Sequence, residues 1–272
     1  SSFPVLVLGE TGTGKELAAR AIHDLSARAA HPFVAINSST LQETILESEL
    51  FGYRKGAFTG AQTDKMGLLE IAHNGTLFVD EVGDMGLTIQ AKLLRVLETG
   101  VFVKLGDTKE TRVDIRFIFA TNKNLKAEMQ EKKFRSDLFF RINTFTITLP
   151  PLREKKEDIA LLADYFLDKF SRGGERKQFS PKAIGFFMAY EWPGNVRELE
   201  NVIERSVLLS GQRPQILAED FPEDMLKNLH LEAPAAQTLP ASGPVNLSRM
   251  EDEHIRAVLA SVDGNKSEAA RL

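Results

Sequence analysis

Short apolar runs alternate with amphipathic segments along the first half of the chain. The runs typical of buried strands cover residues 3–8, 33–36, 76–79, 116–120 and 145–149. Between them, apolar residues recur at helical spacing, for example over residues 15–28 and 89–97. Continuous apolar runs suit strands that are covered on both faces. The alternation therefore predicts an α/β fold, with an open parallel sheet and helices on both sides of it.

After Pro151 the pattern becomes helical, and no further strand is predicted. One helical face in residues 157–170 carries Ile159, Leu162, Ala163, Phe166, Leu167 and Phe170. Ser180-Pro181 predicts an N-cap with proline at the first helical position. Asn195 and Glu198 predict a capping box just after Pro193-Gly194. These signals predict a small helical domain.

The last part of the chain has a different composition. Residues 232–245 hold three prolines and few residues that could form a core, which is typical of a linker. Ser248 and Glu251 form a second capping-box pattern, and Asp263-Gly264-Asn265 predicts a turn. We expect four parts: an α/β domain (1–152), a helical domain (153–229), a linker (230–245) and the beginning of a helix-turn-helix (246–272).

Composition narrows the classes of function. Of the 272 residues, 43% are hydrophobic and 26% are charged, as in globular proteins. The formal net charge of −4 argues against phosphate-backbone binding as the main role of the chain. The absence of cysteine excludes disulfide scaffolds, thiolate metal sites and cysteine nucleophiles, and it suits a reducing cytoplasm. No apolar run approaches the ~20 residues of a transmembrane helix, so we expect no membrane partner.

A glycine-rich loop follows the first predicted strand. Gly9-Glu10-Thr11-Gly12-Thr13-Gly14-Lys15 matches the G-x-x-x-x-G-K pattern between a strand and a helix. In such a loop the backbone N–H groups surround phosphate oxygens, and the lysine reaches the β- and γ-phosphates. Glu16 replaces the usual Ser or Thr, so a Mg²⁺ ion would depend on water and on another carboxylate.

Polar residues follow three other predicted strands. Asp80-Glu81 ends an apolar strand, where Asp80 would bind Mg²⁺ and Glu81 would orient the attacking water. Asn122 and Asn37 hold matching places, and ligands of such sheets bind beyond the carboxyl ends of the strands. The alternatives are an exposed acidic strand end for the carboxylates and turn capping for the two asparagines.

Two further segments suggest contacts with other molecules. Arg135 and Arg141 could reach the phosphates of a neighbouring subunit, and the alternative is a pair of surface salt bridges. In residues 56–61 two glycines flank a phenylalanine and a threonine, which favours a mobile loop that presents an aromatic side chain. The alternative is that Phe58 belongs to the core.

Seven segments together resemble the successive motifs of one family, in order and at the usual spacing: GETGTGKE, ESELFGYRKGAFTGA, GTLFVDE, ATN, FRSDLFFR, LPPLRE and WPGNVREL. Residues 3–210 are similar to the AAA+ domain of sigma-54-dependent bacterial transcription activators, the NtrC-like enhancer-binding proteins. GAFTGA is the most specific motif, because other AAA+ proteins lack it, and Glu16 is normal in this family. Residues 246–272 resemble the start of a Fis-type helix-turn-helix.

The resemblance implies roles for the candidate residues. Asp80 and Glu81 would serve Mg²⁺ and water, Asn122 would be sensor I, and Asn37 would restrain the catalytic glutamate. Arg135 and Arg141 would act in trans, and residues near 100–114 would form a second pore-side loop. ATP would be bound by Gly9, Glu10, Thr11, Gly12, Thr13, Gly14, Lys15, Glu16 and Arg197, the last as sensor II. Sigma-54 would be contacted by Gly56, Ala57, Phe58, Thr59, Gly60 and Ala61.

The implied protein is a Mg²⁺-dependent ATPase that forms a ring, expected as a hexamer with a heptamer as the alternative. Its GAFTGA loops would remodel the sigma-54 RNA polymerase holoenzyme from the closed to the open promoter complex. Enhancer DNA would be a partner of the full-length protein only. Two other classes stay open: a generic AAA+ unfoldase, and a regulator that binds nucleotide without turnover. An ATPase assay and a sigma-54 binding assay distinguish them.

Overall fold

The computed structural model describes residues 3–171, 177–222 and 225–226. The predicted linker and helix-turn-helix, residues 230–272, lie outside the described residues. The division of the chain at residues 152, 229 and 245 stays a prediction.

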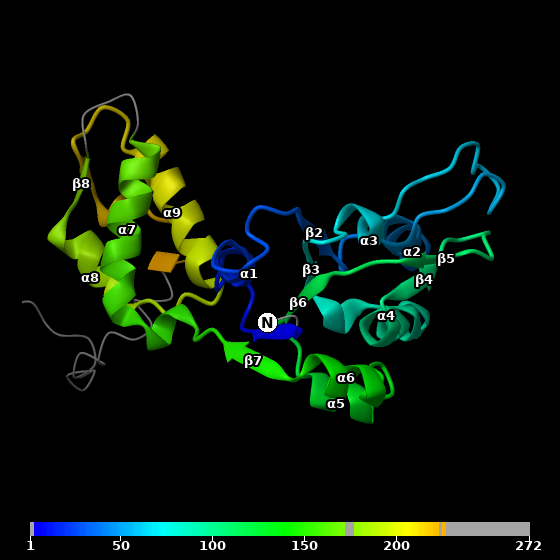
Figure 1. Ribbon diagram of the computed structural model, residues 1–272. Coiled ribbons are helices and arrows are strands. Elements are labelled where there is room, and N and C mark those ends of the chain that lie inside the picture. The colour runs from blue at the N-terminus through cyan, green and yellow to red at the C-terminus, as the bar shows by residue number, and fades with distance from the viewer. Residues whose placement is uncertain (1–2, 172–176, 223–224, 227–272) are drawn as a thin grey trace, which may run out of the picture. The chain divides into compact units, whose positions relative to one another are not determined.

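A parallel sheet forms the centre of the first part of the chain (Figure 1). Its strand order is β2-β3-β6-β1-β7, and every neighbouring pair runs parallel. The strands are β1 (Val5–Leu8), β2 (Phe33–Asn37), β3 (Thr76–Asp80), β6 (Arg116–Thr121) and β7 (Phe145–Thr148). All five predicted strands are confirmed, and their carboxyl ends lie at one edge of the sheet.

Side chains of alternate residues cover the two faces of the sheet. On β6, Phe117 and Phe119 join one hydrophobic cluster, whereas Ile118 and Ala120 join another. The same alternation places Leu6 of β1 in the first cluster and its neighbours in the second. Successive side chains of a strand point to opposite faces. The continuous apolar runs therefore reflect a sheet that is buried on both sides.

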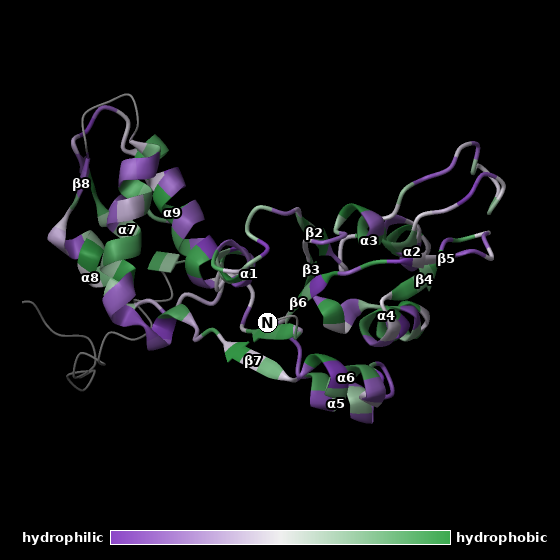
Figure 2. Ribbon diagram, viewed as in Figure 1, coloured by the Kyte–Doolittle hydropathy of each residue, from purple (hydrophilic) through white to green (hydrophobic). Residues whose placement is uncertain are grey.

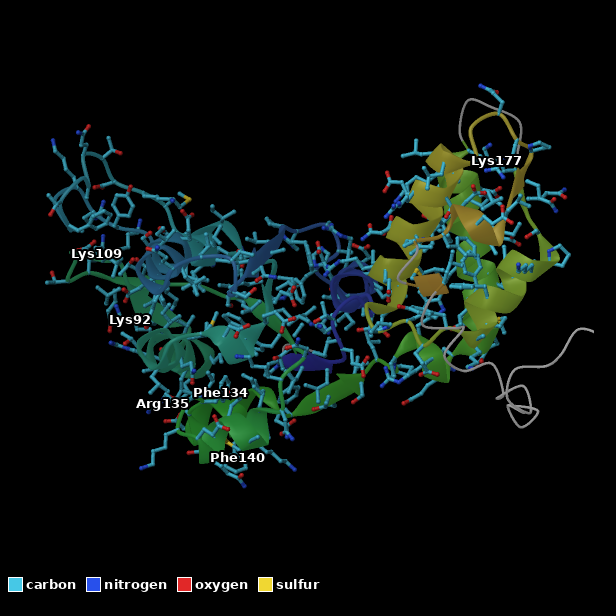
Figure 3. The ribbon with its side chains drawn as sticks, turned by 180° about the vertical axis from the view of Figure 1, so that it is seen from behind. Lys92, Lys109, Phe134, Arg135, Phe140 and Lys177 are labelled. Carbon is cyan, nitrogen blue, oxygen red and sulfur yellow. The ribbon has the colours of Figure 1, made fainter. Side chains whose placement is uncertain are left out.

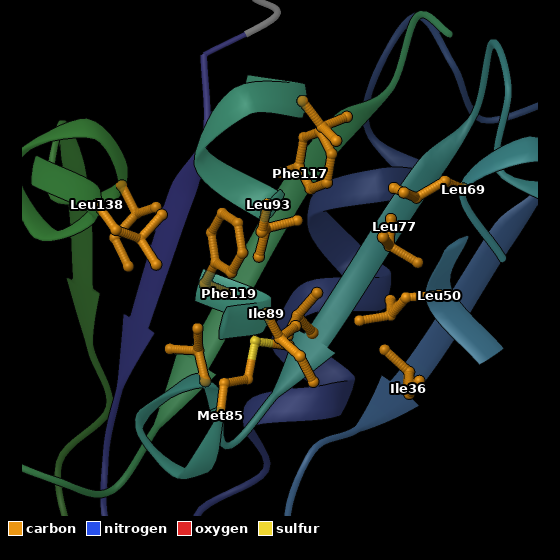
Figure 4. Packing of buried hydrophobic residues seen from close by; sticks show 14 of the residues in the cluster. Ile36, Leu50, Leu69, Leu77, Met85, Ile89, Leu93, Phe117, Phe119 and Leu138 are labelled. Carbon is orange, nitrogen blue, oxygen red and sulfur yellow. The ribbon is translucent and has the colours of Figure 1, made fainter. Parts of the chain in front are cut away.

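Helices supply the opposing apolar surfaces. Ile89 and Leu93 of α4 are fully buried beside Phe119 (Figure 4), and burial of each such side chain contributes about 1.5–3 kcal/mol. On the other face, Ala19 of α1 packs against Ile118 and Ala120. The helices of this part are α1 (Lys15–Asp24), α2 (Glu43–Phe51), α3 (Leu68–Ile71), α4 (Leu87–Thr99), α5 (Leu125–Gln130) and α6 (Ser136–Ile142).

The helix predicted over residues 15–28 is too long. The helix α1 ends at Asp24, and Leu25 is exposed. Arg28 instead donates hydrogen bonds to the carbonyl of Gly75 and to Asp114, at the opposite edge of the sheet from the glycine loop. These contacts favour a turn over another helical turn.

Two short strands were missed within residues 100–114. They are β4 (Val101–Val103) and β5 (Glu110–Arg112), which pair antiparallel as a hairpin. Three residues are too few to establish a period of two, and the charged β5 has no apolar run. The segment predicted as a second loop, residues 100–114, is therefore a β-hairpin.

The second part of the chain is mainly helical. It contains a 3-10 turn, η2 (Leu152–Glu154), and the helices α7 (Lys156–Phe170), α8 (Pro181–Ala189) and α9 (Asn195–Leu209). Hydrophobic and hydrophilic residues alternate along α7 and α9 (Figure 2), and their apolar faces meet around the fully buried Trp192. The predicted cap of α8 is confirmed, since the Ser180 hydroxyl accepts a hydrogen bond from the Ala183 N–H.

The prediction that no strand follows Pro151 is wrong. Strands β8 (Gln178–Phe179) and β9 (Gln215–Ile216) pair with each other in parallel. Each has two residues, which is too short for a sequence pattern to reveal. Across the described ranges, no helix is both long and apolar enough to span a bilayer.

Candidate functional site

The glycine loop joins β1 to α1 in the conformation that its glycines permit. Gly12 and Gly14 have φ angles of 81° and 91°, in the left-handed region that residues with a Cβ rarely adopt. Lys15 is 7% exposed, and its ammonium group donates to the carbonyl oxygens of Gly9 (3.0 Å) and Glu10 (3.2 Å). The loop therefore folds around its own lysine, with the lysine at the first position of the helix.

Two carboxylates lie beside this lysine. Asp80 ends β3, and Glu81 follows it in a left-handed conformation with a φ of 52°. One Glu81 oxygen lies 3.5 Å from Lys15 Nζ, and the other accepts from the Asn122 N–H at 3.1 Å. Burial, together with the charge of Glu81, raises the pKa of Asp80. A cation near Asp80 would be stabilised by the two adjacent carboxylates.

Both predicted asparagines belong to the same site. The Asn37 side chain donates to Asp80 Oδ2 at 3.1 Å, because Asn37 and Asp80 are paired residues at the ends of β2 and β3. The Asn122 side chain donates to the Thr11 hydroxyl at 3.0 Å. Asn37 thus contacts the aspartate, although the resemblance implied that it restrains the glutamate.

These groups line a cleft of about 440 Å³. Ten candidate residues border it: Thr11, Gly12, Gly14, Lys15, Glu16, Asn37, Asp80, Glu81, Asn122 and Arg197. Five lining residues were not predicted, namely Leu17, Ser39, Asp84, Val196 and Glu200. Val196, Arg197 and Glu200 belong to α9. The cleft therefore lies between the carboxyl edge of the sheet and the helical part.

Glu10 was predicted to bind nucleotide, but its side chain contacts the helical part. Both guanidinium terminal nitrogens of Arg153 donate to its two oxygens, at 2.8 and 2.7 Å. These hydrogen bonds, followed by one from Asn195, lower the pKa of Glu10 to about 2. The Glu10 carboxylate is thus a charged partner of Arg153.

The predicted capping box of Asn195 and Glu198 is wrong. The helix cap is Gly194, and the Glu198 carboxylate accepts from the Gly194 N–H at 2.8 Å. Asn195 does not cap the helix: it is completely buried, and its side chain bonds to Leu152 and to the glycine loop. Helical spacing reveals a polar residue near a helix start, but not which distant backbone groups it contacts.

Arg135 and Arg141 lie away from the cleft of their own chain. Arg135 forms two hydrogen bonds with Asp137, at 3.1 and 2.6 Å, so the salt bridge considered as an alternative is present. Arg141, in the last turn of α6, donates to the carbonyl of Leu97 at 3.2 Å. Figure 3 labels Arg135 together with the exposed Phe140 of the same segment.

Residues 56–61 form a closed loop between α2 and α3, which is exposed at Gly56 and over residues 58–60, whereas Ala61 is buried. The Gly56 N–H donates to the Ala61 carbonyl at 2.8 Å, which closes the loop at its base. Phe58 is 47% exposed, and its ring meets the Tyr53 ring edge-on, with 5.0 Å between centroids. The alternative that Phe58 belongs to the core is therefore wrong.

The β4–β5 hairpin supports this loop, and the two extend side by side (Figure 1). Arg54 forms ion pairs with Asp64, on the other arm of the loop, and with Asp107 in the hairpin, the latter at 2.9 Å. The Arg54 N–H also donates to the Leu105 carbonyl. The hydrogen bond from Arg54, followed by one from the Lys109 N–H, lowers the pKa of Asp107 to about 2.

Comparison with protein families identifies both parts of the chain. Residues 1–148 match the model of the sigma-54 interaction domain. The chain belongs to the sigma-54 interaction domain family. Residues 153–238 match the AAA+ ATPase lid domain. The helical part is therefore called the lid below, and the resemblance drawn from the motifs is confirmed.

Curated relatives of this sigma-54 interaction domain are named as regulatory proteins. The regulatory protein AtoC of Escherichia coli K12 is 48% identical over 278 residues, covering 100% of this chain and 60% of AtoC. The DNA-binding transcriptional regulator NtrC of Klebsiella pneumoniae is 43% identical over 295 residues, covering 100% of this chain and 62% of NtrC. The chain thus spans about three fifths of these proteins.

A solved structure supports the same AAA+ fold. NtrX of Brucella abortus in complex with ATP is 34% identical, with a TM-score of 0.77, and the match covers 100% of this chain and 60% of that chain. NtrX has also been solved with ADP. The parallel sheet with a helical lid is therefore the fold of an AAA+ ATPase.

Proposed function

We propose that this sigma-54 interaction domain is a Mg²⁺-dependent ATPase that acts in a ring oligomer and remodels sigma-54 RNA polymerase. The observation that carries the proposal is the convergence of Lys15, Glu81 and Asn122 at the glycine loop, within one cleft. ATP bound to NtrX, a structure with the same fold, supports the choice of nucleotide.

The residues of the cleft suit hydrolysis of a phosphate anhydride. The N–H groups of the glycine loop and the start of α1 would bind the phosphates, and Lys15 would neutralise their charge. Glu81 is held by Lys15 and by the Asn122 N–H, and in this place its carboxylate would accept a proton from an attacking water. Asn122 would contact the terminal phosphate.

The donor set fits Mg²⁺. This ion is commonly held by one or two carboxylates, with phosphate oxygens and water completing its coordination. Asp80 supplies a partly buried carboxylate whose raised pKa reflects burial and the nearby Glu81, and a divalent cation would offset both effects. When bound, the ion would neutralise charge on the phosphate oxygens.

The exposed arginines support assembly into a ring. Arg141 lies outside the cleft of its own chain, and an arginine supplied by a neighbouring subunit can raise phosphoryl-transfer rates by about 10³–10⁵-fold. We expect Arg135 and Arg141 to act on the nucleotide of the adjacent copy, in a hexamer or a heptamer. Release of Arg135 from Asp137 would then accompany assembly.

The exposed loop supplies the contact with sigma-54. Phe58 is half exposed at a closed loop that the β4–β5 hairpin supports, which suits a surface that engages a protein partner. Nucleotide-driven movement of Gly56, Ala57, Phe58, Thr59, Gly60 and Ala61 would convert the closed promoter complex into the open one. Enhancer DNA would be bound by the full-length protein only.

Two measurements test the proposal. Steady-state ATP hydrolysis should require Mg²⁺, and its specific rate should rise with protein concentration. Purified sigma-54 should bind in the presence of an ATP transition-state analogue. Glu81→Gln should abolish hydrolysis while ATP binding is retained, because the glutamine cannot accept the proton. Undetectable wild-type hydrolysis, or full hydrolysis by Glu81→Gln, would refute the catalytic assignment.

A further inference from the structure

The passage from the sheet into the lid contains a bidentate ion pair. Arg153 lies in η2, directly after β7, and both its terminal nitrogens bond to Glu10 of the glycine loop. In such a pair the two parallel N–H···O hydrogen bonds fix the relative orientation of the two side chains, in addition to the attraction between their charges. The partners are 35% and 44% exposed, so the pair is accessible to solvent and can open without unfolding either part.

Asn195 makes a second connection at the same place. It has no exposed surface, and its φ of 53° is a left-handed conformation that asparagine tolerates better than most residues. Its side-chain oxygen accepts from the Leu152 N–H at 2.8 Å. Its side-chain nitrogen donates to the Thr11 carbonyl at 3.0 Å and to Glu10 Oε2 at 3.2 Å. One amide therefore bonds to the lid and to the glycine loop at once.

The start of α9 completes the contact. The N–H groups of Val196 and Arg197 point to the carbonyl of Gly12, at 3.0 and 3.4 Å. Val196 and Arg197 also line the cleft. Three consecutive loop residues, Glu10 to Gly12, thus contact the lid, while the Glu10 carbonyl on the same segment accepts from Lys15.

We propose that Glu10, Arg153 and Asn195 form a latch that holds the lid against the glycine loop and so positions Arg197 at the nucleotide. They are positioning residues, since their side chains bond to each other and to backbone groups. The inference rests on the proposed nucleotide binding. Because the loop contacts both the lid and the bound phosphates, nucleotide occupancy and lid closure are linked, and each favours the other.

Two variants open the latch in different ways. Asn195→Asp keeps the size, the tolerance of a left-handed backbone and the acceptor for the Leu152 N–H. It removes the donor to the loop and places a negative charge beside Glu10. Arg153→Met removes the exposed ion pair and leaves Asn195 intact. Lys177→Met is the matched control, because Lys177 (Figure 3) donates to the carbonyls of Gly211 and Arg213, within the lid.

Lid position can be measured directly in the full chain. The protein has no cysteine, so cysteines introduced at the exposed Lys126 and Lys182 carry a pair of spin labels, one on α5 and one on α8. Nucleotide affinity is measured separately with a fluorescent, non-hydrolysable ATP analogue. We expect both latch variants to broaden the distribution of label distances measured without nucleotide. Both should also weaken binding of the ATP analogue by about fivefold or more, whereas the control should change neither quantity.

Exchanging the two charges tests whether the Glu10–Arg153 ion pair itself holds the lid in place. The double variant Glu10→Arg/Arg153→Glu should restore the narrow distance distribution that Arg153→Met loses. Unchanged distances in both Asn195→Asp and Arg153→Met would overturn the latch. A wild-type chain that fails to bind the analogue would refute the proposed function instead, and the distances measured without nucleotide would still decide whether the latch exists.

Discussion

Alanine substitutions at Gly12 and Gly14 should lower thermal stability by unequal amounts, because only Gly12 contacts the lid. Gly12 and Gly14 both have left-handed φ angles, of 81° and 91°. A Cβ built on Gly12 would overlap the carbonyl oxygen of Gly194 and approach Arg197 Cβ to 3.2 Å. A Cβ built on Gly14 would meet no atom within 4 Å. Gly14→Ala is therefore the matched control for Gly12→Ala.

The expected cost follows from these contacts. Each alanine carries the strain of a left-handed conformation, about 1–2 kcal/mol. Gly12→Ala adds overlap with a backbone atom, which cannot rotate away as a flexible side chain would. Overpacking of this kind costs about 1–3 kcal/mol. The alternative, in which the start of α9 moves away, would instead weaken the two N–H contacts to Gly12, at about 0.5–1.5 kcal/mol each.

Thermal unfolding without nucleotide measures the difference. In a protein of this size 1 kcal/mol corresponds to a shift of about 2–4 °C in Tm. We expect the Tm of Gly12→Ala to lie about 2–12 °C below that of Gly14→Ala. The label pair on Lys126 and Lys182 should also report a displaced lid in Gly12→Ala alone. Equal Tm values and equal label distances in the two variants would refute the close approach of the lid to the glycine loop.

Three further predictions concern the exposed loop and the latch. Phe58→Ala should cost only about 0.5–1.5 kcal/mol of stability, against about 3–5 kcal/mol for the buried Phe51→Ala. It should retain ATP hydrolysis but lose sigma-54 binding, and unimpaired binding would contradict the role of the loop. Asp107→Asn should leave ATP hydrolysis unchanged. It should accelerate proteolysis within residues 54–64 and weaken sigma-54 binding. Unchanged proteolysis would show that the hairpin does not support the loop. The folded-state pKa of Glu10 is about 2, below its usual 4.5, so its stabilising contribution is complete above about pH 4.5 and is lost as the pH falls towards 2. Label distances should therefore be constant from about pH 5 to 8 and broaden only in acid, and broadening between pH 5 and 8 would contradict the assignment.

The features that could be predicted from the sequence depend on neighbouring residues. Apolar runs predicted the five strands of the sheet, because a strand buried on both faces must be apolar along its length. The G-x-x-x-x-G-K pattern predicted a loop between a strand and a helix, and in the structure its Gly12 and Gly14 adopt left-handed φ angles that other residues avoid. The carboxyl ends of parallel strands share an edge, so Asp80 and Asn122 could be placed in one site before their contacts were known.

Other features depend on residues that are distant along the chain, and these only the tertiary structure decided. Glu10 belongs to a phosphate-binding motif, yet its carboxylate pairs with Arg153, 143 positions later. Asn195 has the spacing of a helix cap. Its side chain is completely buried, however, and forms hydrogen bonds with the Leu152 N–H and the Thr11 carbonyl. A local pattern specifies backbone conformation and burial, whereas the partner of a polar side chain depends on which distant segment packs against it.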